Sequence, residues 1–487
     1  MKLLKDILYK VSVNAVYGDT NVKVAQVDFD SRKVVKDSLF VAQKGTSVDG
    51  HLYIDKAISL GATTIICEEL PIRLEANITF IQVEDSNKTL AIIASNFYDN
   101  PSSKLKLIGV TGTNGKTTVA SLLYQLFKKS GYKTGLLSTV QILVDTTVFK
   151  ATHTTPDSVT INYYLHQMVL LGVDYCFMEV SSHGIHQKRT EGLEFDGGIF
   201  TNLSHDHLDY HVSFASYRDV KKSFFDSLPK TAFALTNLDD KNGNIMLQNT
   251  KARKRTYALK TLADYKAKII EKSFSGTLIS INDTEFWTKL IGNFNAYNLA
   301  AIIGVAYELG LEKLEILTII SQLESVSGRF EHLVSDNGVI AIVDYAHTPD
   351  ALKNVLETIN NIRTNNEKLI TVIGCGGDRD KTKRPKMAHI ASQLSTQAIF
   401  TSDNPRTENP ETILEEMEEG VSAENLKKII TISDRRQAIK TACKFSETGD
   451  ILLIAGKGHE NYQEISGERF HFDDLVEVKK YFNLLKK

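Results

Sequence analysis

The chain has 487 residues, which is too long for a single hydrophobic core and predicts roughly two to four domains. Its composition, 42% hydrophobic and 24% charged with a formal net charge of −2, is typical of a globular protein and argues against a nucleic-acid or membrane partner. No apolar run is long enough to span a bilayer, and the early charges of residues 1–6 are unlike a secretory signal. The four widely spaced cysteines form no CxxC pair, so we expect reduced thiols in a cytoplasmic protein.

Strand-like apolar runs alternate with helical stretches along the chain. This alternation predicts α/β domains with largely parallel sheets. Two polar segments rich in turn residues, at 98–103 and 327–338, interrupt it and are candidate domain boundaries.

Residues 107–118 are the most informative segment. A buried strand leads into a glycine-rich turn, followed by Lys116 and Thr117 at the start of a helix expected over 119–129. The two glycines of the turn let backbone N–H groups approach phosphate oxygens, and the helix N-terminus adds its positive end. Lys116 can reach the β- and γ-phosphates, and the Thr117 hydroxyl can bind Mg²⁺. Although Val110 replaces the usual first glycine, the segment predicts nucleotide binding; the alternative is a tight turn without a ligand.

Polar residues also follow the next two apolar strands. Glu179 ends one of them, where a carboxylate can bind Mg²⁺ beside a phosphate loop, although a lone glutamate is more often an ion-pair partner. Three histidines and two aspartates lie within 204–211, after the second strand. Histidine density alone suggests zinc, but the phosphate loop favours magnesium with one histidine involved. Lys221, in the amphipathic stretch 217–228, is from the residues alone part of a solvated helix face.

The last third of the chain contains four apolar strands, expected at 339–343, 369–373, 398–401 and 451–454. Each is followed by a polar loop, and in open parallel sheets ligands bind beyond the carboxyl ends of the strands. The loops therefore predict a second site that faces the phosphate loop, with ordinary turns as the alternative. Its candidate charged residues are Arg379, Asp403, Arg406, Lys457 and Glu460.

Two shorter segments each allow two interpretations. Either Thr154 or Thr155 could cap the following helix, with the next proline in its first turn, or their hydroxyls could hold a ligand. Asn295 and Asn298 lie before a helix expected over 299–309, where either could contact a nucleobase or act as a cap.

Taken together, the motifs resemble the Mur ligase family, the cytoplasmic ATP-dependent amide ligases that build the peptide of the peptidoglycan precursor. The resemblance covers essentially the whole chain, and the joint signal is specific although no single motif is. The shared motifs occur in order at 112–118, 179–184, 206–210, 328–331 and 344–347. Phe330 stands where methionine is frequent in the family, which should change packing rather than chemistry.

The resemblance implies an α/β fold of three domains with mostly parallel sheets. These are a UDP-MurNAc (uridine)-binding domain at 1–100, a central phosphate-loop mononucleotide-binding domain at 101–331 and a C-terminal Rossmann-like, amino-acid-binding domain at 332–487. Two motifs, at 153–157 and 403–406, are most similar to members that add the third amino acid. In members that add lysine the arginine of the second motif is typically absent, so Arg406 favours meso-diaminopimelate.

The resemblance also implies the roles of individual residues. ATP is expected to contact Gly112, Thr113, Asn114, Gly115, Lys116, Thr117, Thr118, Asn295, Arg329 and Asp344. UDP-MurNAc-L-Ala-D-Glu is expected to contact Ser31, Thr154, Thr155, Ser181, Gln187 and Arg189. meso-Diaminopimelate is expected to contact Arg379, Asp403, Asn404, Pro405, Arg406, Gly456 and Glu460.

The same family match implies a magnesium centre with a modified lysine. Its expected ligands are Thr117, Glu179, His207 and Lys221, and the expected catalytic residues are Lys116, Lys221, His207 and Glu179. Lys221 matches a lysine that CO₂ converts to a carbamate. An ammonium group beside two Mg²⁺ ions would be repelled, whereas a carbamate is an anionic oxygen ligand.

We therefore expect ATP to phosphorylate the D-glutamyl γ-carboxylate and an amine of diaminopimelate to attack the acyl phosphate, giving amide, ADP and phosphate. The expected partners are these small molecules, with no nucleic acid or membrane, and the chain is expected to be a monomer. Alternatives are the same reaction with L-lysine, a folylpoly-γ-glutamate synthase, a phosphate-loop NTPase switch or transport ATPase, and a catalytically silent binding protein. The motifs at 154–157 and 403–406 argue against the synthase, and an NTPase would need no amino acid.

Overall fold

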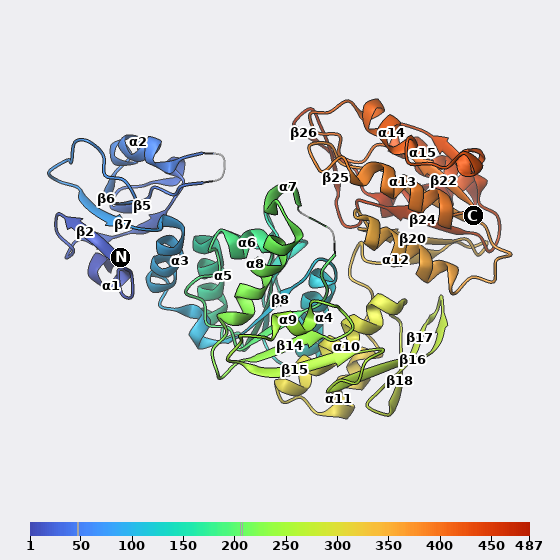
Figure 1. Ribbon diagram of the computed structural model, residues 1–487, viewed down its shortest axis with the longest axis horizontal. Helices are drawn as coiled ribbons and strands as arrows, with labels where there is room; N and C mark the ends of the chain where they lie inside the picture. The colour runs from blue at the N-terminus through green and yellow to red at the C-terminus, as the bar shows by residue number, and fades with distance from the viewer. Residues whose placement is uncertain (46–47, 205, 207) are drawn as a thin grey trace.

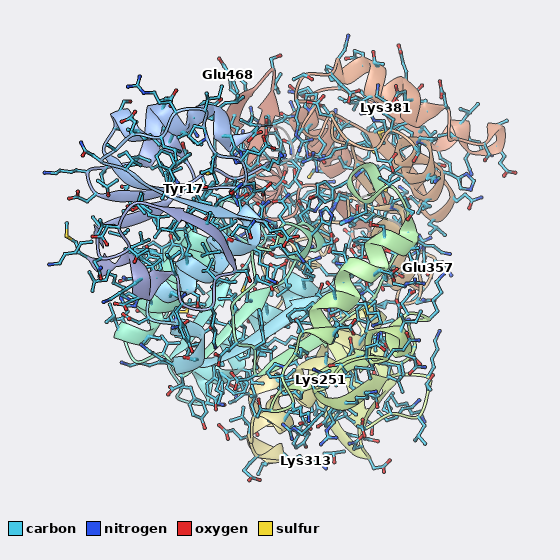
Figure 2. The ribbon with its side chains drawn as sticks, turned by 60° about the vertical axis from the view of Figure 1, so that its left-hand side comes forward. Tyr17, Lys251, Lys313, Glu357, Lys381 and Glu468 are labelled. Carbon is cyan, nitrogen blue, oxygen red and sulfur yellow. The ribbon has the colours of Figure 1, made fainter. Side chains whose placement is uncertain are left out.

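Three α/β bodies follow one another along the chain, each built around one of the three larger sheets (Figure 1). The first and third lie at opposite ends of the molecule with the second between them, and Tyr17, Lys251 and Lys381 mark the three bodies in Figure 2. None of the described helices is both long and apolar enough to cross a membrane. This computed structural model describes residues 1–45, 48–204, 206 and 208–487.

The first body contains a five-stranded sheet in the order β2-β7-β6-β5-β4. Strands β4 to β7 are parallel, and β2 is antiparallel at one edge. All four residues of β5 are buried, as expected of a parallel strand covered on both faces. The elements are β1 (Lys2–Leu3), α1 (Leu4–Ile7), β2 (Val13–Tyr17), β3 (Lys23–Val24), β4 (Gln26–Asp28), β5 (Ser38–Val41), α2 (Ile54–Ser59), β6 (Ala62–Cys67), β7 (Thr79–Val83) and α3 (Ser86–Phe97).

The second body has an eleven-stranded sheet in the order β11-β10-β9-β12-β8-β13-β14-β15-β16-β17-β18. Strands β9 to β16 in this order are parallel, and antiparallel strands extend the sheet at both ends. The strands are β8 (Lys106–Thr111), β9 (Thr134–Leu137), β10 (Gln141–Val144), β11 (Thr147–Lys150), β12 (Tyr175–Glu179), β13 (Gly197–Phe200), β14 (Phe233–Asn237), β15 (Arg253–Ala258), β16 (Tyr265–Ser273), β17 (Gly276–Ile281) and β18 (Thr284–Thr288).

Helices cover both faces of this sheet (Figure 1). The apolar residues of α4 and α10 pack into one core and those of α5 and α8 into another. The helices are α4 (Lys116–Lys129), α5 (Ser158–Leu170), α6 (Ser182–His186), α7 (Leu208–His211), α8 (Phe214–Asp226), α9 (Gly243–Met246), α10 (Asn293–Glu308) and α11 (Lys313–Ile320).

Two helices of this body begin earlier than predicted. α4 begins at Lys116 and α10 at Asn293, each directly after a glycine. Gly115 and Gly292 have φ angles of +90° and +103°, a region that favours glycine and turns the chain sharply into the helix. The glycines therefore mark the helix starts, and the residues that follow them belong to the first turn.

Of the two interpretations of Thr154 and Thr155, the one that makes either of them the cap of α5 is wrong. Asp157 is the residue that caps this helix, since its side chain accepts a hydrogen bond from Thr160 N at 2.9 Å. Thr154 and Thr155 precede the cap, and Pro156 lies outside the first turn. The threonine hydroxyls consequently make their contacts elsewhere, in the candidate site described below.

The third body has a six-stranded sheet in the order β19-β20-β24-β21-β22-β23, parallel except for β19. The four predicted strands correspond to β20, β21, β22 and β24. The elements are β19 (Glu331–Val334), β20 (Ile340–Asp344), α12 (Pro349–Asn360), β21 (Leu369–Ile373), α13 (Lys383–Leu394), β22 (Gln397–Phe400), α14 (Pro410–Glu418), β23 (Ile429–Thr431), α15 (Arg435–Phe445), β24 (Ile451–Ala455), β25 (Tyr462–Ile465), β26 (Glu468–His471) and α16 (Asp474–Leu485).

Candidate active site

The phosphate loop joins β8 to α4 and is held by the residues that follow β13. Thr113 N donates to the Asn202 carbonyl at 2.8 Å. A Cβ atom added to Gly112 would lie 1.9 Å from Thr201 Oγ1, and the φ angles of Gly112 and Gly115 are +149° and +90°. Only glycine fits both positions, and the open backbone leaves room for an anion at the start of α4.

Two lysines from different helices meet at this loop. Lys116 Nζ donates to the carbonyls of Gly112 at 2.9 Å and Thr113 at 2.8 Å. Lys221 Nζ, from α8, donates to the same Gly112 carbonyl at 2.9 Å. Burial lowers the pKa of both ammonium groups, and the charge of Lys116 lowers the pKa of Lys221 further.

The expectation that Lys221 lies on a solvated helix face is wrong. Its side chain is 1% exposed, because α8 packs the face that carries Tyr217, Lys221 and Phe225 onto the rest of the body. The neighbouring Lys222 is on the outer side, where it pairs with Asp226 at 2.7 Å. A buried ammonium group beside a second one requires a compensating anion.

Glu179, the last residue of β12, lies level with Val110 of β8 and is fully buried. Its carboxylate accepts hydrogen bonds from Thr139 N at 2.8 Å and Thr139 Oγ1 at 3.2 Å. The charge of Glu179 raises the pKa of Lys116, so the two groups are close enough to interact. The strand therefore delivers an anion to the phosphate loop.

Thr117 and Glu179 supply oxygen donors of the kind that Mg²⁺ prefers, which favours magnesium over zinc. The charge of Asp206 raises the pKa of both site lysines, which places this carboxylate near the loop. Within the described part of the chain no three His, Cys, Asp or Glu side chains group closely enough to hold a metal ion. The predicted ligand His207 lies outside the described residues.

The predicted muramoyl-dipeptide residues of the second body form one connected group. Thr155 Oγ1 donates to the Glu179 carbonyl at 2.8 Å and accepts from Ser181 N at 2.9 Å. Arg189 donates to the Thr155 carbonyl at 2.6 Å and to Gln187 Oε1 at 2.7 Å.

The two remaining members of that list lie on either side of this group. Thr154 Oγ1 lies 3.1 Å from Thr139 Oγ1, within hydrogen-bond distance and beside the Glu179 carboxylate. Ser31 belongs to the first body and is buried in the turn after β4, where its carbonyl accepts from Val34 N at 3.4 Å.

Asn295 and Asn298 lie inside α10 rather than before it. Asn295 Nδ2 donates to the Ile291 carbonyl at 2.9 Å, and Asn298 Nδ2 donates to Asn295 Oδ1 at 3.1 Å. Asn298 Oδ1 would lie 2.7 Å from a Cβ atom at Gly115, so this side chain touches the phosphate loop.

Thr118, another predicted ATP contact, is buried in the first turn of α4.

Arg329 connects the phosphate loop to the third body. Its Nη2 donates to Thr117 Oγ1 at 3.1 Å, and its guanidinium lies 4.6 Å from the ring centroid of Tyr345. Asp344 accepts from Phe330 N at 2.7 Å. Burial raises the pKa of Asp344 to about 6, against the opposing charge of Arg329.

Phe330, which replaces the methionine frequent in the family, is a packing residue. Its side chain is 1% exposed, and its ring centroid lies 5.7 Å from that of Phe294.

The carboxyl ends of β20, β21, β22 and β24 meet at one edge of the third sheet. Beyond them, Asn404 Nδ2 donates to Glu460 Oε2 at 2.8 Å. Lys457 Nζ lies 3.0 Å from Asn404 Oδ1 and 3.4 Å from both Asp403 Oδ1 and Glu460 Oε2. A Cβ atom at Gly456 would lie 2.7 Å from Asp403 Oδ2, so glycine makes room for this carboxylate.

Arg406 belongs to the same loop as Asp403 and Asn404, and hydrogen bonds hold both its backbone and its guanidinium. Its N–H donates to the Glu464 carbonyl at 3.0 Å, and its Nη1 donates to the Gly377 carbonyl at 2.6 Å. Pro405 is buried beside it. Arg379 is exposed and donates to the Asp378 carbonyl at 3.4 Å, so of the predicted amino-acid ligands it is the least enclosed.

Models of three Mur ligase domains match the chain. They are described as the catalytic domain of the Mur ligase family over 23–98, the Mur ligase middle domain over 110–306 and the Mur ligase glutamate ligase domain over 328–458. The chain is 54% identical to the UDP-N-acetylmuramoyl-L-alanyl-D-glutamate–2,6-diaminopimelate ligase of Cytophaga hutchinsonii, covering 99% of this chain and 100% of the relative. The protein of that name from Phocaeicola vulgatus is 52% identical, covering 99% of each chain.

The chain belongs to the Mur ligase family. The resemblance found in the motifs is thereby confirmed, as is the three-domain α/β fold. A solved structure of a protein with the same ligase name is 31% identical and has a TM-score of 0.70 over 100% of this chain and 99% of that one. The folylpolyglutamate synthase of Thermotoga maritima, 16% identical with a TM-score of 0.60 over 81% of this chain and 92% of that one, shares the fold alone.

The structure adds two Mur ligase residues that the sequence analysis did not single out. Thr139 binds the Glu179 carboxylate, and Asn202 orients the phosphate loop. Lys457, predicted from the sequence as a charged residue of the second site, lies among the predicted amino-acid ligands. Asn202 follows β13 beside the loop strand, so its position was detectable as a polar residue beyond a strand end. Thr139 follows a short strand whose neighbour is fixed only by the fold.

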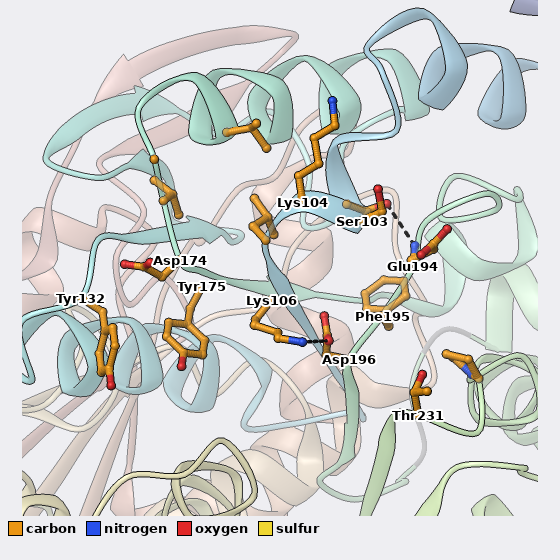
Figure 3. Close-up of a pocket in the computed structure, with 16 residues that line it drawn as sticks. Ser103, Lys104, Lys106, Tyr132, Asp174, Tyr175, Glu194, Phe195, Asp196 and Thr231 are labelled. Atoms are coloured by element: carbon orange, nitrogen blue, oxygen red, sulfur yellow. Dashed lines mark hydrogen bonds and ion pairs between the residues drawn. The ribbon is translucent and has the colours of Figure 1, made fainter.

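A cavity of about 570 Å³ opens on the opposite edge of the central sheet, at the amino ends of β8, β12 and β13 (Figure 3). Lys106 Nζ pairs with Asp196 Oδ1 at 2.7 Å in its wall, and Asp196 Oδ2 accepts from Leu107 N at 3.1 Å. The cavity lies away from the phosphate loop, and these charges serve to join two strands. We assign it no part in the chemistry.

Proposed function

We propose that this Mur ligase uses ATP to join meso-diaminopimelate to the D-glutamyl γ-carboxylate of UDP-MurNAc-L-Ala-D-Glu. The observation that carries the proposal is that Asp403 and Arg406, in the loop after β22, and Glu460, in the loop after β24, lie at one edge of the third sheet, in a site connected to the phosphate loop through Arg329. A guanidinium and carboxylates in one site suit a ligand end that has both a carboxylate and an ammonium group. The names of the relatives at 52–54% identity over their full lengths support the same substrates.

The reaction divides between the two connected sites. Lys116 is placed to neutralise the charge that develops as the γ-phosphoryl group moves to the carboxylate of the dipeptide. Thr155, Ser181 and Arg189 hold and orient that dipeptide beside the Glu179 strand end. The amine of the amino acid then attacks the acyl phosphate carbon, phosphate leaves, and the amine loses a proton as the amide forms. Holding the reactants together supplies much of the rate acceleration.

We assign Mg²⁺ to Thr117, Glu179, His207 and a carbamylated Lys221. Bound Mg²⁺ would screen the phosphate charges during transfer. The support for a carbamate is the burial of Lys221 against the Gly112 carbonyl near a second ammonium group. In the modification the neutral amine attacks CO₂ and releases one proton, which replaces a buried cation by an anion.

We divide the molecule at residues 100 and 331, so that the first unit binds the uridine end, the second ATP and dipeptide, and the third the amino acid. We further propose that the enzyme acts in the cytoplasm, as the resemblance to the Mur ligase family implies, and that it acts as a monomer.

Phosphate release with purified protein tests the proposal. The reaction contains ATP, Mg²⁺, UDP-MurNAc-L-Ala-D-Glu and one amino acid from a panel that includes meso-diaminopimelate, L-lysine and L-glutamate. We expect release that requires both the dipeptide and meso-diaminopimelate, with a product one diaminopimelyl residue heavier by mass spectrometry. Release without an amino acid would indicate an NTPase, and preferential use of L-lysine would overturn the substrate assignment alone.

A further inference from the structure

Lys457 is a buried cation to which the reaction gives no role. It lies in the loop after β24, and its side chain is 0% exposed. Its Nζ is 3.0 Å from Asn404 Oδ1 and 3.4 Å from a carboxylate oxygen of each of Asp403 and Glu460. The face of the Tyr462 ring lies 5.6 Å from the same atom. Burying an ammonium group costs several kcal/mol unless it is paired, so its place between two carboxylates calls for an explanation.

The surrounding groups leave the charge of this cluster unchanged. Arg435 is buried near the end of β24, where its Nη2 donates to the Ala455 carbonyl at 3.0 Å. Its charge is balanced by the equally buried Asp474, with which it pairs at 2.7 Å. Tyr345 and Tyr462 border the cluster as neutral hydroxyl groups, because burial raises the pKa of both phenols. Arg379 is exposed to solvent at the edge.

The cluster therefore combines two acidic side chains, Asp403 and Glu460, with the ammonium group of Lys457, and the guanidinium of Arg406 belongs to the same loop as Asp403. Burial and the charge of Asp403 raise the pKa of Glu460, whereas the charge of Lys457 lowers it. Lys457 is enclosed by the two acidic side chains, whereas Arg406 is half-buried. Lys457 thus offsets one of the two carboxylate charges and leaves the other for a ligand.

We propose that Lys457 is a specificity-determining residue, which cancels one of the two carboxylate charges so that the site matches a zwitterionic head group and rejects a lone ammonium group. The inference rests on the proposed function, because it explains how diaminopimelate is told from lysine. Both amino acids carry an ammonium group at their far end, but only diaminopimelate also carries a carboxylate there.

Removing the charge of Lys457 should reverse this balance. Two carboxylates would then face the ligand, which attracts the far ammonium group of lysine and repels the far carboxylate of diaminopimelate. Specificity is a difference between two binding free energies. A residue that strengthens the binding of one amino acid and weakens that of the other therefore changes the ratio of their kcat/KM values. A residue with only a structural role would weaken both ligands alike.

The test compares Lys457→Met with the wild type and with Lys440→Met, which removes an exposed lysine of α15 in the same body. Values of kcat and KM are measured for meso-diaminopimelate, L-lysine and ATP. For Lys457→Met we expect the ratio of kcat/KM for diaminopimelate to that for lysine to fall by at least about tenfold, the size of one charge-assisted contact. The change should appear as a higher KM for diaminopimelate, with the KM for ATP within about twofold. Lys440→Met should keep the wild-type ratio.

A double variant checks that charge rather than shape is responsible. Lys457→Met with Glu460→Gln has the same net charge as the wild type in this cluster, so its ratio should recover at least about fivefold relative to Lys457→Met. Thermal melting is recorded for every variant. If Lys457→Met does not fold, Lys457→Gln, which retains a donor for Asn404, takes its place with the same expected ratio.

Each outcome separates this inference from the proposed function. Equal losses for both amino acids, or a double variant that discriminates no better than the single one, would overturn the role of Lys457. A wild-type enzyme that ligates neither amino acid would instead refute the proposed function.

Discussion

Two ammonium groups share one acceptor at the phosphate loop, since Lys116 and Lys221 both donate to the Gly112 carbonyl at 2.9 Å. Lys116 is half-buried, whereas Lys221 is almost completely enclosed. Two like charges at one oxygen repel each other, which is a cost that a functional site retains for a reason. Converting one lysine to a carbamate removes the repulsion and supplies an oxygen ligand.

The carbamate predicts a specific pattern of rescue. Lys221→Ala should lose at least about 100-fold in kcat, because the magnesium centre loses an anionic ligand. Formate or acetate should restore part of that activity by occupying the vacated space, and Lys221→Arg should remain nearly inactive. Phosphate-release kinetics with and without added carboxylate give the answer, and Lys222→Ala serves as the matched control. If Lys221→Arg turns over at the wild-type rate, the residue acts as a cation and carries no carbamate.

The proposed function gives Arg406 the role of selecting the amino acid. Its Nη1 donates to the Gly377 carbonyl at 2.6 Å, which fixes one nitrogen of a guanidinium that can also bind a carboxylate. Losing a hydrogen bond to a charged group costs about 1.5–3 kcal/mol, or roughly one to two decades in affinity. Arg406→Ala should therefore lower kcat/KM for meso-diaminopimelate by about 10- to 100-fold and change that for lysine much less. Steady-state kinetics with both amino acids measure the difference; an equal decrease for both would contradict the assignment.

At the scale of elements, the regular pattern of apolar strands was readable from the sequence, while helix starts were less so. β20, β21, β22 and β24 match their predicted ranges closely because their apolar runs end at glycine, aspartate or short polar residues. The cap of α5 stayed open in the sequence because threonine and aspartate both cap helices, and only tertiary contacts assign Thr155 to the Glu179 carbonyl. The burial of Lys221 could not be predicted from the sequence either. An amphipathic pattern shows which face of a helix is apolar, but it does not show how deeply a single polar side chain is buried.

The phosphate loop depends on glycine at 112 for a reason that a substitution can isolate. Gly112→Ala would place a Cβ atom 1.9 Å from Thr201 Oγ1 and must displace the loop from β13. We expect ATP affinity to fall by at least about tenfold, because backbone donors leave their positions. Gly131→Ala is the matched control, since Gly131 also has a positive φ, +91°, with nothing within 4 Å of the added atom. It should cost only about 1 kcal/mol of stability. ATP titrations and thermal melts of both variants test this, and equal ATP affinities would count against the loop geometry.

At the scale of the whole molecule, the order of the motifs predicts which body binds which ligand. The contacts between the bodies, by contrast, could be seen only in the structure. Arg329 was expected to bind ATP, yet it also contacts Thr117 of the second body and the Tyr345 ring of the third. The contact with Thr117 joins residues 212 positions apart. Local patterns hold no information about such contacts, because the angle between domains depends on packing at a small interface.

That interface contains a backbone contact whose removal should separate binding from turnover. Gly328 precedes the third body with a φ of +68°, and a Cβ atom there would lie 2.0 Å from His459 N and 2.3 Å from Gly458 C. Gly328→Ala must therefore push the segment between the bodies away from the loop that carries Glu460. The phosphate loop and the cluster around Glu460 keep their own contacts, but the acyl phosphate and the amine no longer meet correctly, and we expect kcat to fall by at least about tenfold, equivalent to about 1.4 kcal/mol. ATP affinity, measured by titration, should fall less than kcat, because Arg329 is the one expected ATP contact that directly follows Gly328. Gly338→Ala supplies the control, since Gly338 has a similar φ of +86° but only Thr448 Cγ2, at 3.8 Å, near the added atom. If the two variants lose the same activity, backbone strain rather than the contact between the bodies explains the loss.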